Sequence, residues 1–194
     1  MVENYGVKDS LQALAQKSTH NVVDNLSVGD KLKKVWGGQY VVDTTDIGSL
    51  IGPVSKGTVP YGRIHNVLKS DQDKIMNYFE TANEVPISEV VNAGLGQCLE
   101  KAILVQLSAQ TGKESYLING FLELDEFESP SARHGYNIVF KDNSPYLIDA
   151  ENPFPANEEG KSLPYIVPVL GLTGDRGNFV LPDDAKLGRN YSIF

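Results

Sequence analysis

Residues 94–107 have the sequence GLGQCLEKAILVQL, and they predict the central helix of the fold. The glycines at positions 94 and 96 favour a flexible lead-in, whereas the run from Cys98 onward consists largely of strong helix formers. We therefore expect a helix from Cys98 to about Gln110, ended by Gly112. Apolar residues cover much of its circumference, which is typical of a helix buried in the middle of a fold.

Cys98 is the only cysteine of the chain. On the first turn of a helix, its thiol would face unpaired backbone N–H groups and the positive end of the helix dipole, and both favour thiolate over thiol. The pattern therefore indicates a reactive thiol. A lone cysteine on an apolar helix is also often a small buried hydrophobic residue, and that structural interpretation stays open.

Three strands are expected downstream of this helix, at residues 115–124, 135–140 and 146–150. The segment at residues 141–145 contains Asp, Asn, Ser and Pro, and it predicts a turn that joins the second and third strands into a hairpin. A histidine, His134, directly precedes the second strand, and an aspartate lies near the end of the third.

The predicted hairpin places His134 and Asp149 relative to each other. If Asp142 and Asn143 form a two-residue turn, the two side chains fall on the same face and diagonal to one another. Their backbones are then separated by ~7–8 Å, a distance that side chains can bridge. A turn one residue longer or shorter would put them on opposite faces, so the spacing permits the pairing without proving it.

Together, Cys98, His134 and Asp149 are the parts of a nucleophilic acyl-transfer site. Asp149 would fix the tautomer of the imidazole, His134 would take the thiol proton, and the thiolate would attack a carbonyl carbon. Each residue alone has an equally good structural interpretation, so the hypothesis depends on their joint occurrence. His20 and His65 are alternative bases, but neither is followed by a strand that ends in aspartate.

The first part of the chain predicts helices and loops. Residues 8–26 carry apolar residues at roughly helical spacing. Residues 27–66 are rich in glycine and proline, contain short β-rich pieces such as residues 39–42, and predict loops with one hairpin. A second helix is expected from Ser70, and a short helical piece at residues 87–91 precedes the glycine lead-in.

We expect one domain of class α+β for all 194 residues. It would consist of a helical and loop-rich N-terminal layer at residues 1–66, a core at residues 67–182 and a loosely held polar tail at residues 183–194. Residues 165–172 and 178–181 predict one or two further strands of the core.

Composition and charge exclude several classes of function. The net charge of −8 opposes binding to nucleic acid, since nothing offsets the repulsion from phosphate. No apolar run approaches the ~20 residues of a membrane span. Residues 1–6 lack the regions of a signal peptide, which favours a cytoplasmic protein or one delivered by a specialised secretion route. A single cysteine excludes an internal disulfide, and the sequence contains no recognisable metal-ligand or calcium-type carboxylate cluster.

The motifs around these residues resemble those of a known family. Residues 96–104, GQCLEKAIL, look like the Gly-x-Cys-x-(Asp/Glu)-Lys-Ala segment of the transglutaminase-like superfamily of papain-like thiol enzymes. Gly120-Phe121, then RHGYNIVF at residues 133–140, then YLIDAENP at residues 146–153 follow in the order of that family. The resemblance spans residues 90–155, about one third of the chain.

The resemblance implies a papain-like core, in which a helix carrying Cys98 packs on an antiparallel sheet that carries His134 and Asp149 as the rest of a triad. The family contains protein cross-linking enzymes, peptidases, peptide N-glycanases, and bacterial toxins or effectors that deamidate glutamine. Arylamine N-acetyltransferases share the triad, but their Arg-Gly-Gly lead-in is absent here. Members often carry His-Ala-Trp where this chain has His-Gly-Tyr, and Trp36 lies too far upstream to be assigned as an oxyanion partner.

A thiol enzyme of this kind also needs donors for the oxyanion that forms on the attacked carbonyl. The backbone N–H of Cys98 is one candidate, and Gln97 or Asn92 could supply the second, although an amide side chain there is equally suited to capping or bracing the loop. Glu100 and Lys101 are expected to be ordinary exposed helix residues.

The leading hypothesis is a thiol enzyme that acts, without a cofactor or metal, on an amide carbonyl of a protein or peptide through a Cys98 acyl-enzyme. Cysteine protease, glutamine deamidase and transglutaminase remain open, because they differ only in what enters the second half-reaction. The small size favours a bacterial protease or deamidase over a large calcium-dependent cross-linker. The alternatives are an acyltransferase with a thioester donor and a non-catalytic binding module that retains the fold.

Overall fold

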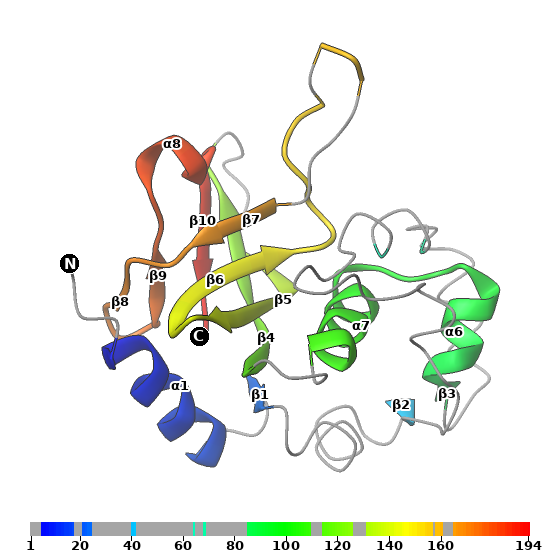
Figure 1. Ribbon diagram of the computed structural model, residues 1–194, viewed down its shortest axis with the longest axis horizontal. Coiled ribbons are helices and arrows are strands. Elements are labelled where there is room, and N and C mark those ends of the chain that lie inside the picture. Colours follow the sequence, from blue (N-terminus) through cyan, green and yellow to red (C-terminus); the bar gives the residue numbers. More distant parts are fainter. Residues whose placement is uncertain are drawn as a thin grey trace.

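The computed structural model describes residues 5–17, 21–24, 40–41, 64, 68, 85–109, 114–125, 131–156, 158–160 and 165–194. Within these ranges most strands belong to one antiparallel sheet, which a few helices accompany (Figure 1). The fold is therefore of class α+β, as predicted. None of the helices in these ranges is long and apolar enough to cross a membrane.

The helices and strands follow one another along the chain with these bounds. The helices are α1 (Tyr5–Lys17), α6 (Ile87–Ala93), α7 (Cys98–Ala109) and α8 (Asp183–Lys186). The strands are β1 (Val22–Asp24), β2 (Tyr40–Val41), β3 (Val85–Pro86), β4 (Ser115–Leu124), β5 (Ala132–Lys141), β6 (Ser144–Asp149), β7 (Tyr165–Pro168), β8 (Gly171–Thr173), β9 (Asn178–Val180) and β10 (Arg189–Ser192). The main sheet has the order β7-β6-β5-β4-β10-β9-β8, with β1 also paired to β4.

The hairpin of β5 and β6 has the register that the sequence predicts. Asp142 and Asn143 adopt left-handed backbone conformations, with φ of 50° and 63°, and close a two-residue turn. Lys141 therefore lies opposite Ser144, as expected. The turn type matches the right-handed twist of the strands, which is why a short polar pair can set the pairing of two long strands.

The sheet is strongly curled. β1 and β10 lie end to end along one edge of β4, because β1 pairs with Tyr116–Ile118 and β10 pairs with Phe121–Leu124. Only two residues separate β7 from β8: Val169 N donates to Pro145 O of β6 (2.9 Å), and Leu170 N donates to Val180 O of β9 (2.8 Å), although β6 and β9 lie near opposite ends of the sheet order. The two ends of the sheet therefore meet, and the strands enclose an apolar interior.

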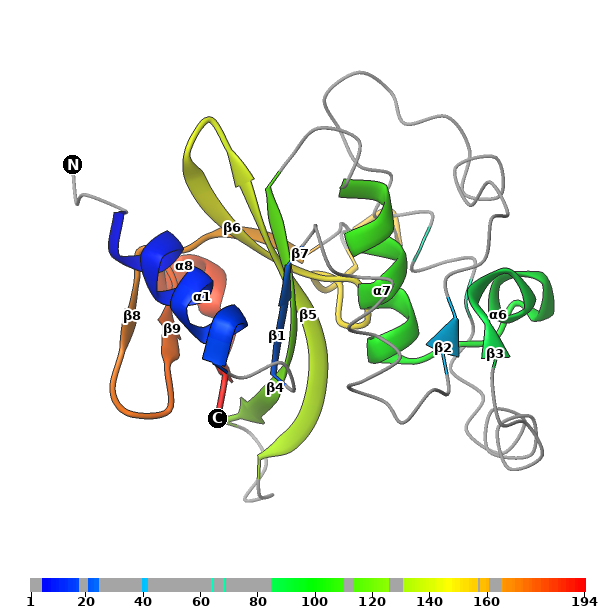
Figure 2. The same cartoon turned by 90° about the horizontal axis from the view of Figure 1, so that it is seen from below.

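Side chains of β4 and β5 alternate between two apolar cores. One core lies between the sheet and α6 and α7, and the other lies within the curl, where α1 also contributes. Leu117 of β4 belongs to the first core, and its neighbours Tyr116 and Ile118 belong to the second. In both views α1 and α7 lie on opposite sides of β4 and β5 (Figures 1 and 2). The middle strands are therefore covered on both faces.

Polar side chains attach α7 to the sheet. Asn137 of β5 donates from Nδ2 to Ala102 O (3.0 Å) and to Gln106 Oε1 (3.2 Å). Gln106 in turn donates from Nε2 to Ser115 O at the start of β4 (3.0 Å). These bonds are buried, so they specify the position of α7 along the strands.

Two boundary predictions are wrong. The first helix does not run through residues 8–26, since α1 ends at Lys17 and Val22–Asp24 form a strand of the sheet. The tail at residues 183–194 is not loosely held, because it forms α8 and then β10 between β4 and β9. Its polar composition concealed this placement: Asn190 donates from Nδ2 to Asp125 Oδ1 (2.7 Å), so the polar residues of β10 have partners. The core therefore extends beyond the predicted limit of residue 182.

Other predictions fall mostly outside the described ranges. These include the helix from Ser70 and most of the loop-rich residues 27–66. Tyr40 and Val41 form β2 and pair in parallel with β3, and the expected hairpin of residues 27–66 lies outside the described residues.

Candidate functional site

Helix α7 begins at Cys98, as the sequence predicts. The carboxylate of Glu100 accepts a hydrogen bond from the backbone N–H of Gln97 (2.8 Å), which is half of a capping box. The N–H of Lys101 donates to Gln97 O (3.0 Å) in the first helical turn. Glu100 is therefore buried, and the expectation that it is an exposed helix residue is wrong, because its side chain satisfies the end of the helix. The thiol of Cys98 is half-buried.

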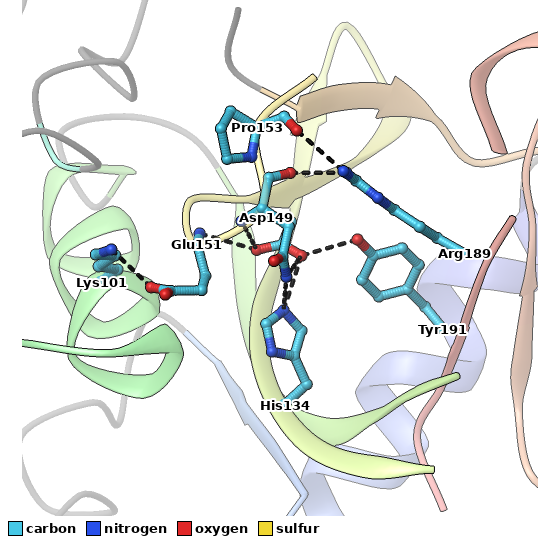
Figure 3. Close-up of polar contacts among 8 residues, drawn as sticks. Lys101, His134, Asp149, Glu151, Pro153, Arg189 and Tyr191 are labelled. Carbon is cyan, nitrogen blue, oxygen red and sulfur yellow. Dashed lines mark hydrogen bonds and ion pairs between the residues drawn. The ribbon is translucent and has the colours of Figure 1, made fainter. Parts of the chain in front are cut away.

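His134 and Asp149 contact each other across the hairpin. His134 lies within β5, opposite Gly120 of β4, and Asp149 is the last residue of β6. The His134 Nε2 and Asp149 Oδ2 atoms are 2.7 Å apart (Figure 3). The side chains therefore share one face, as the two-residue turn predicts. Only 7% of His134 and 1% of Asp149 is exposed, so the interaction is shielded from water.

The loop after β6 wraps around the carboxylate of Asp149. Asp149 Oδ1 accepts the backbone N–H groups of Glu151 (2.9 Å) and Asn152 (3.1 Å). Asp149 Oδ2 accepts Asn152 Nδ2 (3.0 Å) and the hydroxyl of Tyr191 (2.8 Å) in addition to the imidazole. Both carboxylate oxygens are thus bonded, and the orientation of the group is determined on every side.

The electrostatics of this cluster favour an ionised pair. Burial opposes the negative charge of Asp149, but the His134 charge and the hydrogen bonds from His134, Asn152 and Tyr191 lower its pKa to about 2. Burial likewise opposes the positive charge of His134. The charge and hydrogen bond of Asp149, followed by a hydrogen bond with Cys98, raise its pKa to about 10. At neutral pH the imidazole is therefore held as a cation against a carboxylate.

The start of α7 meets the sheet beside His134. Since Nε2 of the imidazole is bonded to Asp149, Nδ1 is the ring nitrogen left to interact with the thiol of Cys98, which also raises the pKa of His134. Gly135 makes this approach possible. A Cβ at that position would lie 2.9 Å from Leu99 Cα and 3.1 Å from Cys98 O, so the first turn of α7 rests directly on the backbone of β5.

An ion pair joins α7 to the loop after Asp149. Lys101 Nζ lies 2.6 Å from Glu151 Oε2, and only 3% of the Lys101 side chain is exposed. The expectation that Lys101 is an exposed helix residue is therefore wrong. Helical periodicity does not reveal an acidic partner fifty residues away, and that partner is what allows a lysine to be buried. The ion pair connects the helix of Cys98 to the segment that holds Asp149.

Three residues of the site were not predicted from the sequence: Asn152, Arg189 and Tyr191. Asn152 had a detectable signal, since an asparagine three residues after a strand-ending aspartate is typical of a turn bonded by side chains. Arg189 donates to Asn152 O (2.7 Å) and Pro153 O (3.0 Å), and its guanidinium lies 4.4 Å from the ring centroid of Tyr165. Arg189 and Tyr191 are two residues apart on β10, so they lie on the same face of the strand. This alternation was the only feature of the sequence that could have indicated them.

The remaining candidates are placed as follows. Gln97 is half-buried directly before Cys98, and its backbone N–H is engaged by Glu100. Asn92 is exposed on α6. Their roles as oxyanion donors stay predictions. The alternative bases His20 and His65 lie outside the described residues, as does Trp36. Among the described residues, no group of three or more His, Cys, Asp or Glu side chains could hold a metal ion.

Comparisons with protein-family models, with curated proteins and with solved structures find no match to this chain.

Proposed function

We propose that this protein is a thiol enzyme that attacks an amide carbonyl of a protein or peptide, with Cys98 as nucleophile, His134 as acid–base and Asp149 as the residue that orients the imidazole. The observation that carries the proposal is the buried 2.7 Å contact between His134 and Asp149, beside a helix that begins at Cys98. These are the parts of an activated nucleophile.

The reaction would proceed in two halves. The thiol proton passes to His134 before the carbonyl is attacked, so the imidazolium is paired with Asp149 when the thiolate of Cys98 bonds to the carbonyl carbon. The imidazolium of His134 then gives that proton to the departing nitrogen, so an amine or ammonia leaves and a thioester remains. Water or an amine then attacks the thioester, His134 takes its proton, and Cys98 leaves as a thiolate, which restores the starting pair with the imidazolium. Water yields hydrolysis or deamidation, and an amine yields cross-linking.

The oxyanion of each half-reaction needs donors near Cys98. The N–H groups of the first helical turn lack acceptors within the helix, so the backbone N–H of Cys98 is the first candidate. The side chain of Gln97 is the second, because its residue directly precedes the nucleophile.

We include in the proposal a papain-like core, supported by the packing of α7 on β4 and β5, and a bacterial protease or deamidase that acts in the cytoplasm or after a specialised secretion route.

Alkylation of Cys98 tests the first step. Because Cys98 is the only cysteine, the mass of the intact protein reports its labelling by iodoacetamide without ambiguity. A free thiol is only a few per cent thiolate at pH 7, so we expect His134→Gln to slow labelling by about 10-fold. His65→Gln, which changes another of the 3 histidines, is the matched control and should label like the wild type.

A substrate screen tests the reaction itself. A proteome incubated with wild-type protein should show new peptide termini or conversion of glutamine to glutamate with release of ammonia, and Cys98→Ala should show neither. If Cys98 labels only after unfolding, and equally fast with and without His134, the thiol-enzyme proposal is wrong. A non-catalytic binding module is then the better explanation.

A further inference from the structure

The C-terminal strand β10 delivers a hydroxyl to the centre of the candidate site. Tyr191 is 1% exposed, and its hydroxyl donates to Asp149 Oδ2 at 2.8 Å. The same oxygen lies 2.7 Å from His134 Nε2. Figure 3 shows the phenol and the imidazole approaching the carboxylate from different strands. The hydroxyl and the imidazole therefore share one oxygen of one carboxylate.

Close packing holds Tyr191 in this position. A Cβ on Gly120 would overlap Ser192 O, so only glycine lets β10 come this near to β4. The hydroxyl of Tyr136 donates to Ser192 O (2.9 Å), which fixes the backbone next to Tyr191. The ring of Tyr191 lies 5.1 Å from that of Tyr136 and 6.2 Å from that of His134, measured between centroids. The phenol therefore has little freedom to leave the carboxylate.

We propose that Tyr191 is a positioning residue of the proposed thiol site. By donating to the same carboxylate oxygen, its hydroxyl limits how strongly the negative charge of Asp149 stabilises the imidazole of His134. Its consequence for turnover rests on the proposed function, whereas its effect on the imidazole does not.

Competition between donors explains the effect. Hydrogen bonds to one anionic oxygen weaken one another, because each draws on the same charge. Asp149 Oδ1 already accepts two backbone N–H groups, so it cannot take over a donor from Oδ2. Without the Tyr191 hydroxyl, the bond from His134 to Asp149 should strengthen, and more so in the imidazolium form. An imidazolium held too tightly is a poorer acid for the departing nitrogen.

The other charged and titratable groups around Asp149 have partners of their own, so we expect them to stay in place when the hydroxyl is removed. Tyr165 of β7 bonds from its hydroxyl to Ala185 O (2.8 Å), and Arg189 of β10 bonds to the loop carbonyls. On the α7 side, Lys101 is paired with Glu151. Burial raises the pKa of Tyr191 above its ordinary range, and the charge and hydrogen bond of Asp149 raise it further, so the phenol remains a donor at every working pH.

The fold supplies a matched control. Tyr165 is buried in the same aromatic cluster, with its ring 6.0 Å from that of Tyr191, but its hydroxyl bonds to a backbone carbonyl of α8 and not to Asp149. Tyr165→Phe and Tyr191→Phe therefore remove the same atom from similar surroundings. A purely structural role for Tyr191 predicts similar effects of the two changes, whereas a positioning role predicts that only Tyr191→Phe alters the imidazole.

The test is nuclear magnetic resonance of the His134 imidazole in a Cys98→Ala background. The chain has 3 histidines, and His134→Gln assigns the resonance. At neutral pH we expect Tyr191→Phe to move the Nε2–H proton downfield and to raise the titration midpoint of His134 by about half a unit, a threefold gain in proton affinity. Tyr165→Phe should change neither. Replacing Tyr191 by 3-fluorotyrosine, a more acidic phenol, should move the resonance upfield.

An unmoved resonance in Tyr191→Phe, or an equal movement in Tyr165→Phe, would overturn the proposal. The 3-fluorotyrosine protein decides the matter if Tyr191→Phe fails to fold, and an unmoved resonance there has the same meaning. Failure of the proposed function looks different: the wild type would show no turnover while the imidazole still responded to Tyr191 alone.

Discussion

Replacement of Asp149 by alanine should destabilise the protein strongly, whether or not the protein is an enzyme. The change removes the acceptor of every hydrogen bond that converges on the carboxylate. It leaves the imidazole of His134 without its counter-charge and the hydroxyl of Tyr191 without its acceptor, in surroundings where Asp149 is only 1% exposed. The backbone N–H groups of Glu151 and Asn152 also lose their partner.

The magnitude follows from the loss of one partner of a buried pair, which costs about 3–5 kcal/mol. Each hydrogen bond to a charged group contributes about 1.5–3 kcal/mol, so the bonds to Asp149 are sufficient to account for that figure. A domain of this kind unfolds with a free energy of about 5–15 kcal/mol, so Asp149→Ala should remove about a fifth of it or more. Asp149→Asn keeps one acceptor oxygen and should cost about 2 kcal/mol, mostly from the lost charge.

Urea denaturation at pH 7, followed by circular dichroism, measures these differences from the midpoint and slope. The control is Asp142→Asn in the exposed β5–β6 turn, where the left-handed backbone suits asparagine and the midpoint should not move. The expected order of stability is wild type and Asp142→Asn first, then Asp149→Asn, then Asp149→Ala. A loss below ~1 kcal/mol for Asp149→Ala at an unchanged slope would refute the reasoning, because the carboxylate would not be holding the buried cluster together.

Three further predictions concern the surroundings of the same carboxylate. The pKa of His134 is raised from 6.5 to about 10, so its contribution to stability is fully present below pH 6.5 and is lost as the pH rises through 10; thermal melts across this range should show the advantage of wild type over His134→Gln shrinking. Gly135→Ala should lower the melting temperature and slow alkylation of the thiol, since its Cβ would lie 2.9 Å from the backbone of α7, whereas Gly171→Ala, which meets nothing within 4 Å, should do neither. Lys101→Met should lower the free energy of unfolding, measured by urea denaturation, by about 2 kcal/mol, because Glu151 loses its ion-pair partner. A Lys101→Met/Glu151→Leu double variant should be more stable than the single variant, an order that a solvent-exposed ion pair would not produce.

Much of the candidate site could be predicted from local patterns. The glycine lead-in and the helix formers after it placed Cys98 at the first residue of α7, and the Asp142-Asn143 turn determined the register that brings His134 and Asp149 together. Each inference uses residues within a few positions of one another. Propensity and turn chemistry act over that range, so a sequence reveals them directly.

The surroundings of Asp149 could not be predicted in the same way. Arg189 and Tyr191 belong to a segment whose polar composition indicated a loose tail, and Lys101 lay at a position where a lysine is usually solvated. Their burial depends on partners far away in the chain, which a helical or strand period does not contain. The sequence by itself determined the start of α7 and the pairing of β5 with β6. Only the tertiary structure decided that β10 enters the sheet beside β4. The position of a strand in a sheet depends on which apolar faces are still uncovered, and which backbone groups still lack partners, after the local elements have formed.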